Sequence, residues 1–512
     1  MVIEMKKVLS ILLIFAIVFS LGTTAFADSQ KCSCGITPVV YIPGFGEPIY
    51  LNPHSENRIS VFPPEDDAIS NAVPDIIKAV LFGLLTGNFD AFGTYAMRAA
   101  ETMLAPAACD KNGNPPVNTG VEYEDPTVDT HKNIAFVGDP GDDNGYFQFI
   151  YDWRLDPIDN AKLLKEYINK VKALTGHDEI ILSAHSQGNT VIASYLYLYG
   201  STGIKKLIML SPAYQGLSFM GALFAQEVSV IEKGDVLADF LSGIMGYEDT
   251  TGRLICAVVK EINRIGIVDG ILHYLQRLLD DQLDRVFNEC LTDIMGTLPG
   301  VWAFVPDKYY EAAKEKVFKN SDEYSILIEK ADNYHYNVQT KICSILTEAK
   351  ANGTDIVIAA GYNIPSIPVS VSSEPQSDFL VDTEYMSLGA VCAPYGEALG
   401  ENYEQKKTKC GHSHVSPDGI IDASTCLFPE YTWFFKNNGH GAFSSDYCAF
   451  IEWAARYEGQ PTVNTTEKYP QFMQIKEGNL QNVETEFAGS TESNFNIIFS
   501  SIVILIKESI QK

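Results

Sequence analysis

The chain has 512 residues, of which 46% are hydrophobic, and its formal net charge at pH 7 is −28. This composition is typical of a globular protein with a large core and excludes a disordered or membrane-embedded chain. So acidic a protein should repel nucleic acid and anionic membranes at long range, and we therefore expect no nucleic-acid partner.

The chain begins with an export signal, which we place at residues 1–27. Lys6 and Lys7 precede an apolar run over residues 8–21, and Ala25-Phe26-Ala27 supplies a cleavage site. The run is shorter than the about 20 apolar residues of a membrane-spanning helix. The sequence therefore predicts a secreted or cell-surface protein, and in that setting its ten cysteines favour disulfides over metal thiolates.

Short aliphatic and aromatic runs alternate with helical patterns along much of the chain. These runs predict strands at residues 39–42, 147–153, 179–182, 206–210, 355–359 and 431–435. Residues 158–174 and about 191–198 have the apolar spacing of helices. Strands separated by helices of this size predict an α/β fold with a mostly parallel sheet and helices on both faces.

This alternation breaks after residue 216, where the pattern becomes almost wholly helical until about residue 351. A helical block between two strands of a parallel sheet is most simply a cap over their carboxyl ends, where ligands bind in such sheets. After the signal we therefore expect a first core part at 28–216 with an insertion at about 47–140, a helical cap at 217–351, a second core part at 352–460 and a C-terminal tail at 461–512.

Ser186 lies in the turn Ala184-His185-Ser186-Gln187-Gly188, between a predicted strand and a predicted helix. A nucleophile elbow needs small residues two positions either side of the serine, because the helix packs closely on the strand there. The usual pattern is Gly-x-Ser-x-Gly, and Ala184 replaces the first glycine. Since alanine is also small, the position predicts an α/β-hydrolase fold with Ser186 as nucleophile.

Serine is a weak nucleophile at neutral pH and needs a base that is oriented by a carboxylate. In this fold the chain order is serine, then acid, then histidine. His440 follows the last predicted strand in a glycine-rich turn, and we predict it to be the base. His412 and His414 precede the favoured acid, and with Cys410 they lack an ordered ligand pattern, so no metal site is predicted.

Two similar stretches supply candidates for the acid. Asp418 is preferred because Gly419 permits the sharp turn that presents a carboxylate at a strand end. Asp378 and Asp382 occupy the other stretch and remain alternatives. The two stretches have similar sequences, which leaves open the interpretation that one of them is only a structural copy of the other.

A tetrahedral oxyanion needs backbone N–H donors that are already in place. Gln187, directly after the nucleophile, should provide one of them. The other should come from Phe45, in the glycine-rich loop after the first predicted strand.

The segment Tyr151-Asp152-Trp153-Arg154, followed by a helix and the elbow, resembles the lecithin:cholesterol acyltransferase family of lipases and acyltransferases. The segment from Leu298 to Pro306, with its central Trp302, is similar to a cap segment of that family. The resemblance also covers Asp418 as acid, His440 as base and the loop that contains Phe45. It implies hydrolysis or transfer of a fatty acyl group from a glycerolipid, without a cofactor. Ala184 and Gln187 depart from the family pattern.

Within that segment, Asp152 and Arg154 alternate about Trp153 at a predicted strand end. They have the spacing to form an ion pair that supports the site, although a purely structural pair is the more common arrangement. We expect a secreted hydrolase of carboxylic esters, glycerolipid esters above all, that acts through an acyl-enzyme on Ser186. A phospholipid:alcohol O-acyltransferase and an inactive protein that binds lipid or a partner at a surface are the alternatives. The lipid or other ester would be met at a membrane or micelle interface through apolar surface.

Overall fold

The structure, a computed structural model, describes residues 36–64, 94, 98, 101–102, 104–127, 145–227, 234–236, 238–239, 250–266, 268–270, 272, 276, 287, 292–319, 321–367, 375–400, 402–407, 411–476 and 478–484. The predicted signal at 1–27, much of the predicted insertion and the end of the predicted tail lie outside these residues.

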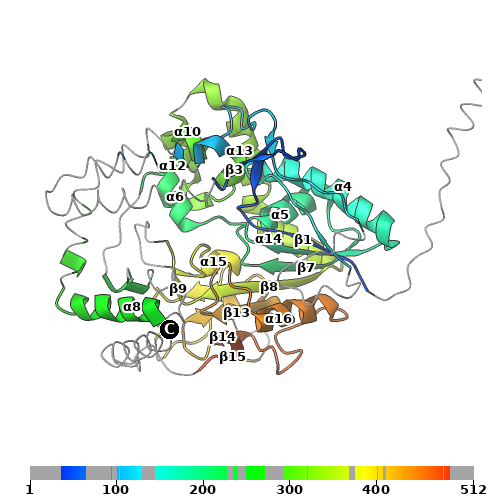
Figure 1. The fold of residues 1–512 in the computed structure, drawn as a ribbon. Coiled ribbons are helices and arrows are strands. Elements are labelled where there is room, and N and C mark those ends of the chain that lie inside the picture. The colour runs from blue at the N-terminus through cyan, green and yellow to red at the C-terminus, as the bar shows by residue number, and fades with distance from the viewer. Residues whose placement is uncertain are drawn as a thin grey trace, which may run out of the picture.

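Within the described chain, the largest sheet has eight strands in the order β15-β14-β13-β8-β7-β6-β1-β5 (Figure 1). Their bounds are β1 (Val39–Ile42), β5 (Tyr146–Gln148), β6 (Ile180–His185), β7 (Ile204–Leu210), β8 (Asp355–Tyr362), β13 (Thr432–Lys436), β14 (Phe472–Lys476) and β15 (Asn479–Asn482). All neighbours pair in parallel except β14 and β15. The predicted α/β character and mostly parallel sheet are confirmed.

Helices cover both faces of this sheet (Figure 1). On β1, Val40 and Ile42 pack into the core cluster that includes α4 (Pro157–Thr175), α5 (Gly188–Tyr199) and α14 (Ile342–Ala351). Val39 and Tyr41 point to the other face, into a second cluster with α16 (Ser445–Arg456). Because successive strand residues face opposite sides, a strand covered on both faces is apolar throughout, and this explains the continuous apolar runs of the sequence.

The described part of the segment between β7 and β8 is largely helical, and Figure 1 shows α6, α10, α12 and α13 gathered above the sheet. The described helices of this segment are α6 (Ser218–Phe224), α8 (Thr250–Asn263), α10 (Thr292–Ile294), α11 (Pro299–Trp302), α12 (Asp307–Phe318), α13 (Ser325–Asn337) and α14. The Gly300 N–H donates to the carbonyl of Arg154, which lies beyond the carboxyl end of β5. The α11 segment therefore contacts the edge of the sheet at which the predicted site residues lie.

Several short elements complete the described structure. They are the strands β2 (Ile49–Leu51), β3 (Ile59–Phe62), β4 (Thr119–Gly120), β9 (Ile364–Pro365), β10 (Gln376–Ser377), β11 (Val391–Cys392) and β12 (Ile421–Asp422), the helix α15 (Thr383–Met386), and the 3-10 helices η1 (Ala105–Ala107), η4 (Met295–Thr297), η5 (Asp322–Tyr324), η6 (Gln339–Lys341), η7 (Ala423–Thr425) and η8 (Pro429–Tyr431). The strand predicted at 147–153 is observed at Tyr146–Gln148.

Six of the ten cysteines fall within the described residues, and all six are free thiols: Cys109, Cys256, Cys343, Cys392, Cys426 and Cys448. Disulfides were expected, but none joins these six thiols. Cys256 donates to Asp239 at 3.4 Å and Cys448 to the carbonyl of Phe443 at 3.8 Å. The other cysteines lie outside the described residues. None of the helices in the described ranges combines the length and apolarity that crossing a membrane requires.

Candidate active site

Ser186 follows β6 in a tight turn and has a left-handed backbone, with φ of 52°. Its N–H donates to the carbonyl of Leu210, the last residue of β7, at 3.0 Å. A Cβ on Gly188 would come within 2.4 Å of the carbonyl oxygen of Ile42, and a Cβ on Gly44 within 2.9 Å of the Ser186 Cβ. Glycine at both positions therefore lets the ends of β1 and β6 approach each other at the serine, which is the geometry of a nucleophile elbow.

His440 pairs with Asp378 and not with the predicted Asp418. Its Nδ1 lies 2.8 Å from Asp378 Oδ2, and its backbone N–H donates to the Asp378 carbonyl, also at 2.8 Å. The Asp378 side chain is fully buried. A Cβ on Gly361, in β8, would come within 2.6 Å of the Asp378 Cβ, so glycine there allows the aspartate to lie against the strand.

The charge on Asp378 is stabilised by several neighbours. Burial alone would raise its pKa, but the His440 imidazole and hydrogen bonds from His440, Val381 and Ser211 bring the pKa below its usual value. Asp378 Oδ1 also accepts the N–H of Val381 at 2.9 Å. An ionised carboxylate against Nδ1 favours the tautomer in which that nitrogen carries the proton.

Asp418 lies in a separate buried cluster. It accepts hydrogen bonds from Ser416 Oγ at 2.6 Å and Tyr362 Oη at 3.2 Å, and it forms an ion pair with Lys436 Nζ at 2.9 Å. These partners satisfy the carboxylate without the imidazole of His440. The prediction of Asp418 as its partner is therefore corrected: the carboxylate that contacts His440 belongs to Asp378. Asp382, the other alternative, instead accepts the N–H of Ser218 at 2.8 Å.

His185 is a site residue that the sequence reading missed. Its Nε2 lies 2.7 Å from the His440 carbonyl, and the two imidazole centroids are 4.7 Å apart. Burial and the neighbouring His440 lower the pKa of His185 to about 3, so its ring is neutral and Nε2–H donates. His185 thereby connects the elbow to the base. Among the described residues no hydrogen bond joins Ser186 Oγ to His440. The position of His185 beside the serine was the available signal.

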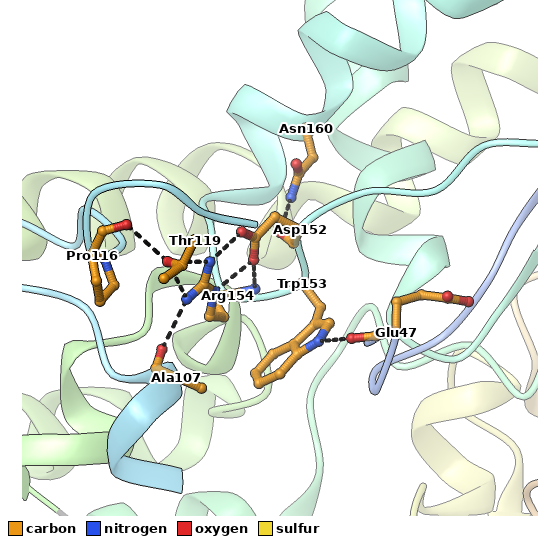
Figure 2. Close-up of polar contacts among 8 residues, drawn as sticks. All are labelled: Glu47, Ala107, Pro116, Thr119, Asp152, Trp153, Arg154 and Asn160. Carbon is orange, nitrogen blue, oxygen red and sulfur yellow. Dashed lines mark hydrogen bonds and ion pairs between the residues drawn. The ribbon is translucent and has the colours of Figure 1, made fainter. Parts of the chain in front are cut away.

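Phe45 and Gln187 lie on the two chain segments that meet at the serine. Neither backbone N–H has an acceptor within the described part of the chain. Tyr151 Oη donates to the carbonyl of Pro43 at 3.0 Å, and Trp153 Nε1 donates to that of Glu47 at 2.8 Å (Figure 2). The loop that carries Phe45 is thus held on both sides, and the two N–H groups remain available to a ligand.

Asp152 and Arg154 form a buried ion pair, with Arg154 Nη2 2.7 Å and Nε 2.9 Å from the carboxylate. Figure 2 shows that they project away from Trp153, towards Ala107 and Thr119. Arg154 Nη1 donates to the carbonyl of Ala107 at 3.4 Å and lies 3.3 Å from Thr119 Oγ1. The pair therefore fastens residues of the predicted insertion to the end of the sheet. None of the pair's described hydrogen bonds is with Ser186, Asp378 or His440.

Within the described ranges, no group of three or more histidine, cysteine, aspartate or glutamate side chains has the arrangement of a metal site. The chemistry available from the described site residues is that of a hydroxyl, an imidazole, a carboxylate and two backbone N–H donors. This set suits nucleophilic attack on a carbonyl carbon.

Comparison with known proteins extends this picture. No match was found among curated proteins. Among solved structures, one match is the crystal structure of a Tle4–Tli4 complex, with 15% sequence identity, a TM-score of 0.18, and coverage of 36% of this chain and 48% of that chain. So low a TM-score supports no conclusion. The model of the lecithin:cholesterol acyltransferase family matches residues 132–237, which include Tyr151 to Arg154 and the elbow at Ser186. The resemblance to that family, which the sequence motifs indicate, is thus confirmed over this part of the chain.

Proposed function

We propose that the chain is a serine hydrolase of the α/β-hydrolase fold, with a helical cap, that cleaves glycerolipid esters through an acyl-enzyme on Ser186. The observation that carries the proposal is the 2.8 Å contact between His440 Nδ1 and Asp378 Oδ2, at the same end of the sheet as a serine in a left-handed turn. Ser186, Asp378 and His440 also follow the chain order of this fold.

The proposed reaction uses the free nitrogen of His440. Nε2 removes the proton from Ser186 Oγ as Oγ attacks the ester carbonyl carbon, and the negative charge moves to the carbonyl oxygen. The N–H groups of Phe45 and Gln187 bind that oxyanion. His440 then gives the proton to the departing alcohol as the ester C–O bond breaks. The hydrogen bond between serine and base is often long before substrate binds and tightens in the complex.

Asp378 has a supporting part in this reaction. Its carboxylate accepts a hydrogen bond from Nδ1–H of His440. This leaves Nε2 without a proton and able to take one from Ser186 Oγ. When His440 takes the serine proton, the imidazolium is stabilised by the adjacent negative charge. His185 stays neutral throughout because burial lowers its pKa to about 3, so it does not compete for the proton.

The glycerolipid substrate rests on the match of residues 132–237 to a family named for acyl transfer from lecithin. The same match favours a second function. In an acyltransferase the acyl-enzyme would be resolved by an alcohol instead of water, with the same residues and the same proton transfers. Export of the protein is also part of the proposal, because Lys6, Lys7 and the apolar run after them have the form of a signal peptide.

The test compares the intact protein with Ser186→Ala. We expect wild-type protein to cleave p-nitrophenyl esters and phospholipids in mixed vesicles, and Ser186→Ala to lose about 10⁴-fold or more in kcat. A fluorophosphonate probe should label only the wild type. Turnover that survives the substitution contradicts the proposal, and failure to label favours a binding protein without activity. Addition of a long-chain alcohol to the vesicles then separates transfer, which gives an ester product, from hydrolysis.

A further inference from the structure

The Gln187 side chain is buried beside the nucleophile and fully committed to hydrogen bonds. Only 1% of Gln187 is exposed. Its Nε2 donates to the carbonyl of Trp153 at 2.9 Å and to that of Gly300 at 3.0 Å. Both amide protons are therefore used, and each goes to a different segment: the loop after β5 and the α11 segment.

Tyr151 connects this amide to the other side of the site. Its hydroxyl lies 3.5 Å from Gln187 Oε1 and donates to the carbonyl of Pro43 at 3.0 Å. Pro43 precedes Gly44 and Phe45 in the loop after β1. The elbow and the Phe45 loop are thus connected through one tyrosine hydroxyl, which is completely buried with its ring.

Trp153 closes the arrangement from the far side of the Phe45 loop. Its indole N–H donates to the Glu47 carbonyl at 2.8 Å (Figure 2), and its ring centroid lies 4.2 Å from that of Phe45. The loop is consequently held before and after Phe45. The Trp153 carbonyl also accepts a hydrogen bond from the Gln187 side chain. Trp153 therefore contacts both of the chain segments that carry a candidate oxyanion donor.

Filling space does not require an amide at position 187. A leucine or methionine would fill a similar volume without the cost of taking a polar amide out of water. The amide is favourable because the carbonyls of Trp153 and Gly300 accept both of its protons. The Tyr151 hydroxyl, whose proton is directed to Pro43, lies 3.5 Å from the amide oxygen. Gln187 therefore fixes the direction of its own peptide, and the N–H of that peptide is one of the two candidate oxyanion donors.

We propose that Gln187 and Tyr151 are positioning residues that hold the N–H donors of Gln187 and Phe45 in register for the oxyanion. This inference rests on the proposed function, because it assigns a task within that same site. Neither side chain takes part in bond making. Their effect should therefore fall on the transition state, in which the oxyanion exists, and not on binding of the uncharged ester.

The experiment measures ester hydrolysis by full-length wild type, Gln187→Met, Tyr151→Phe and the double variant. Tyr167→Phe is the matched control, because Tyr167 is also buried and its hydroxyl donates to a backbone carbonyl, that of Gln148, at 2.8 Å. We expect kcat to fall about 5–10-fold in each single variant with KM within twofold, since a donor is displaced and not removed. The Tyr167→Phe variant should keep the wild-type kcat.

Inactivation by a p-nitrophenyl phosphonate gives a second measurement, because its phosphoryl oxygen occupies the place of the oxyanion. The inactivation rate should fall by the same factor as kcat, and the double variant should lose less than the product of the single losses. Thermal melting shows which variants fold. If Gln187→Met does not fold, Tyr151→Phe alone still tests the inference. Variants that match Tyr167→Phe in kcat, or that change only KM, overturn the inference. A wild type without ester hydrolysis or labelling overturns the proposed function and this inference together.

Discussion

Two loops of this chain share a local design and differ in what they contact. The 378 loop (residues 377–382) and the 418 loop (residues 416–422) each contain a serine, an aspartate, one intervening residue, an apolar pair and a second aspartate, and the 418 loop has Pro417 between its serine and first aspartate. In both, the first aspartate is buried and its Oδ1 lies near the N–H two residues on, Leu380 at 3.2 Å and Ile420 at 3.3 Å.

The difference lies in the partner of the remaining carboxylate oxygen. Asp378 Oδ2 meets the imidazole of His440, whereas Asp418 Oδ2 meets the ammonium of Lys436. Lys436 is the last residue of β13, and His440 follows four residues later. A carboxylate beside an imidazole can orient a proton acceptor, while one beside a partly buried lysine can only neutralise charge. The loop design therefore places a carboxylate, and the neighbour on the adjacent segment decides its use.

The largest expected effect comes from Asp378→Asn. The amide keeps the shape of the side chain but no longer favours the Nδ1–H tautomer of His440 and cannot stabilise the imidazolium. We expect kcat for p-nitrophenyl esters to fall about 10³–10⁴-fold with the melting temperature little changed. Asp418→Asn is the matched comparison in the other loop, and its kcat should stay within a few-fold of wild type. A greater loss of activity in Asp418→Asn would reverse the assignment.

Asp418→Asn should instead act on stability. It leaves the Lys436 ammonium, whose side chain is 16% exposed, without its counter-charge. Breaking one side of a buried ion pair typically costs about 3–5 kcal/mol, and we expect roughly 3 kcal/mol here because Lys436 keeps some access to water. Urea unfolding monitored by tryptophan fluorescence measures the loss. The double variant Asp418→Asn with Lys436→Met should recover part of it; no recovery would show that the ion pair is not the cause.

The second aspartates of the two loops offer a comparison in pH. Burial raises the pKa of Asp382 to about 6, and its Oδ1 has no hydrogen-bond partner among the described residues. Asp422 accepts from Tyr403 Oη at 2.8 Å and from the N–H of Ser424 at 2.9 Å, and these bonds lower its pKa although burial opposes them. The folded chain thus holds a proton on Asp382 more tightly than the unfolded chain does.

Asp382 should therefore stabilise the fold at low pH and lose that contribution as pH rises from about 4 to 6. Asp382→Asn removes this titration, so the free energy of unfolding of the variant relative to wild type should rise by on the order of 2 kcal/mol between pH 4 and pH 8. Asp422→Asn should show the opposite trend, since its lowered pKa contributes stability at higher pH. Parallel pH profiles for wild type and Asp382→Asn would contradict the assignment.

Much of the sheet was predictable because β1, β6, β7, β8 and β13 are buried on both faces and read as continuous apolar runs. The strands at and next to the edges were harder to predict. β5, at one edge, was predicted too long, and neither β15, at the other edge, nor its neighbour β14 was predicted. At an edge, pairing depends on one neighbour, and the sequence pattern alone does not say where that neighbour ends.

The site residues also differ in how far the sequence could predict them. Ser186 was identifiable because its elbow needs small residues within two positions, a local constraint. The partner of His440 could not be identified from the sequence, because it depends on how the loops that follow β8 and β13 meet in space. The preference for Asp418 rested on Gly419, since a left-handed residue usually requires glycine. The structure shows that requirement to be weaker here, because Phe379 occupies the corresponding position with φ of 95° while Gly419 has φ of 69°.

The smallest expected effect tests this last point. A non-glycine residue at positive φ costs about 1 kcal/mol, so Gly419→Ala should lower the free energy of unfolding by about that amount. Phe379→Gly removes the same strain in the other loop but also the contacts of a half-buried ring, so the two terms should nearly cancel. Urea unfolding of both variants gives the comparison. If Phe379→Gly lowers kcat about tenfold while its stability is unchanged, the ring itself holds Asp378 against His440, and the two loops differ in more than their partners. Unchanged kcat would mean that the backbone turn alone, which either residue can adopt, is what presents the carboxylate.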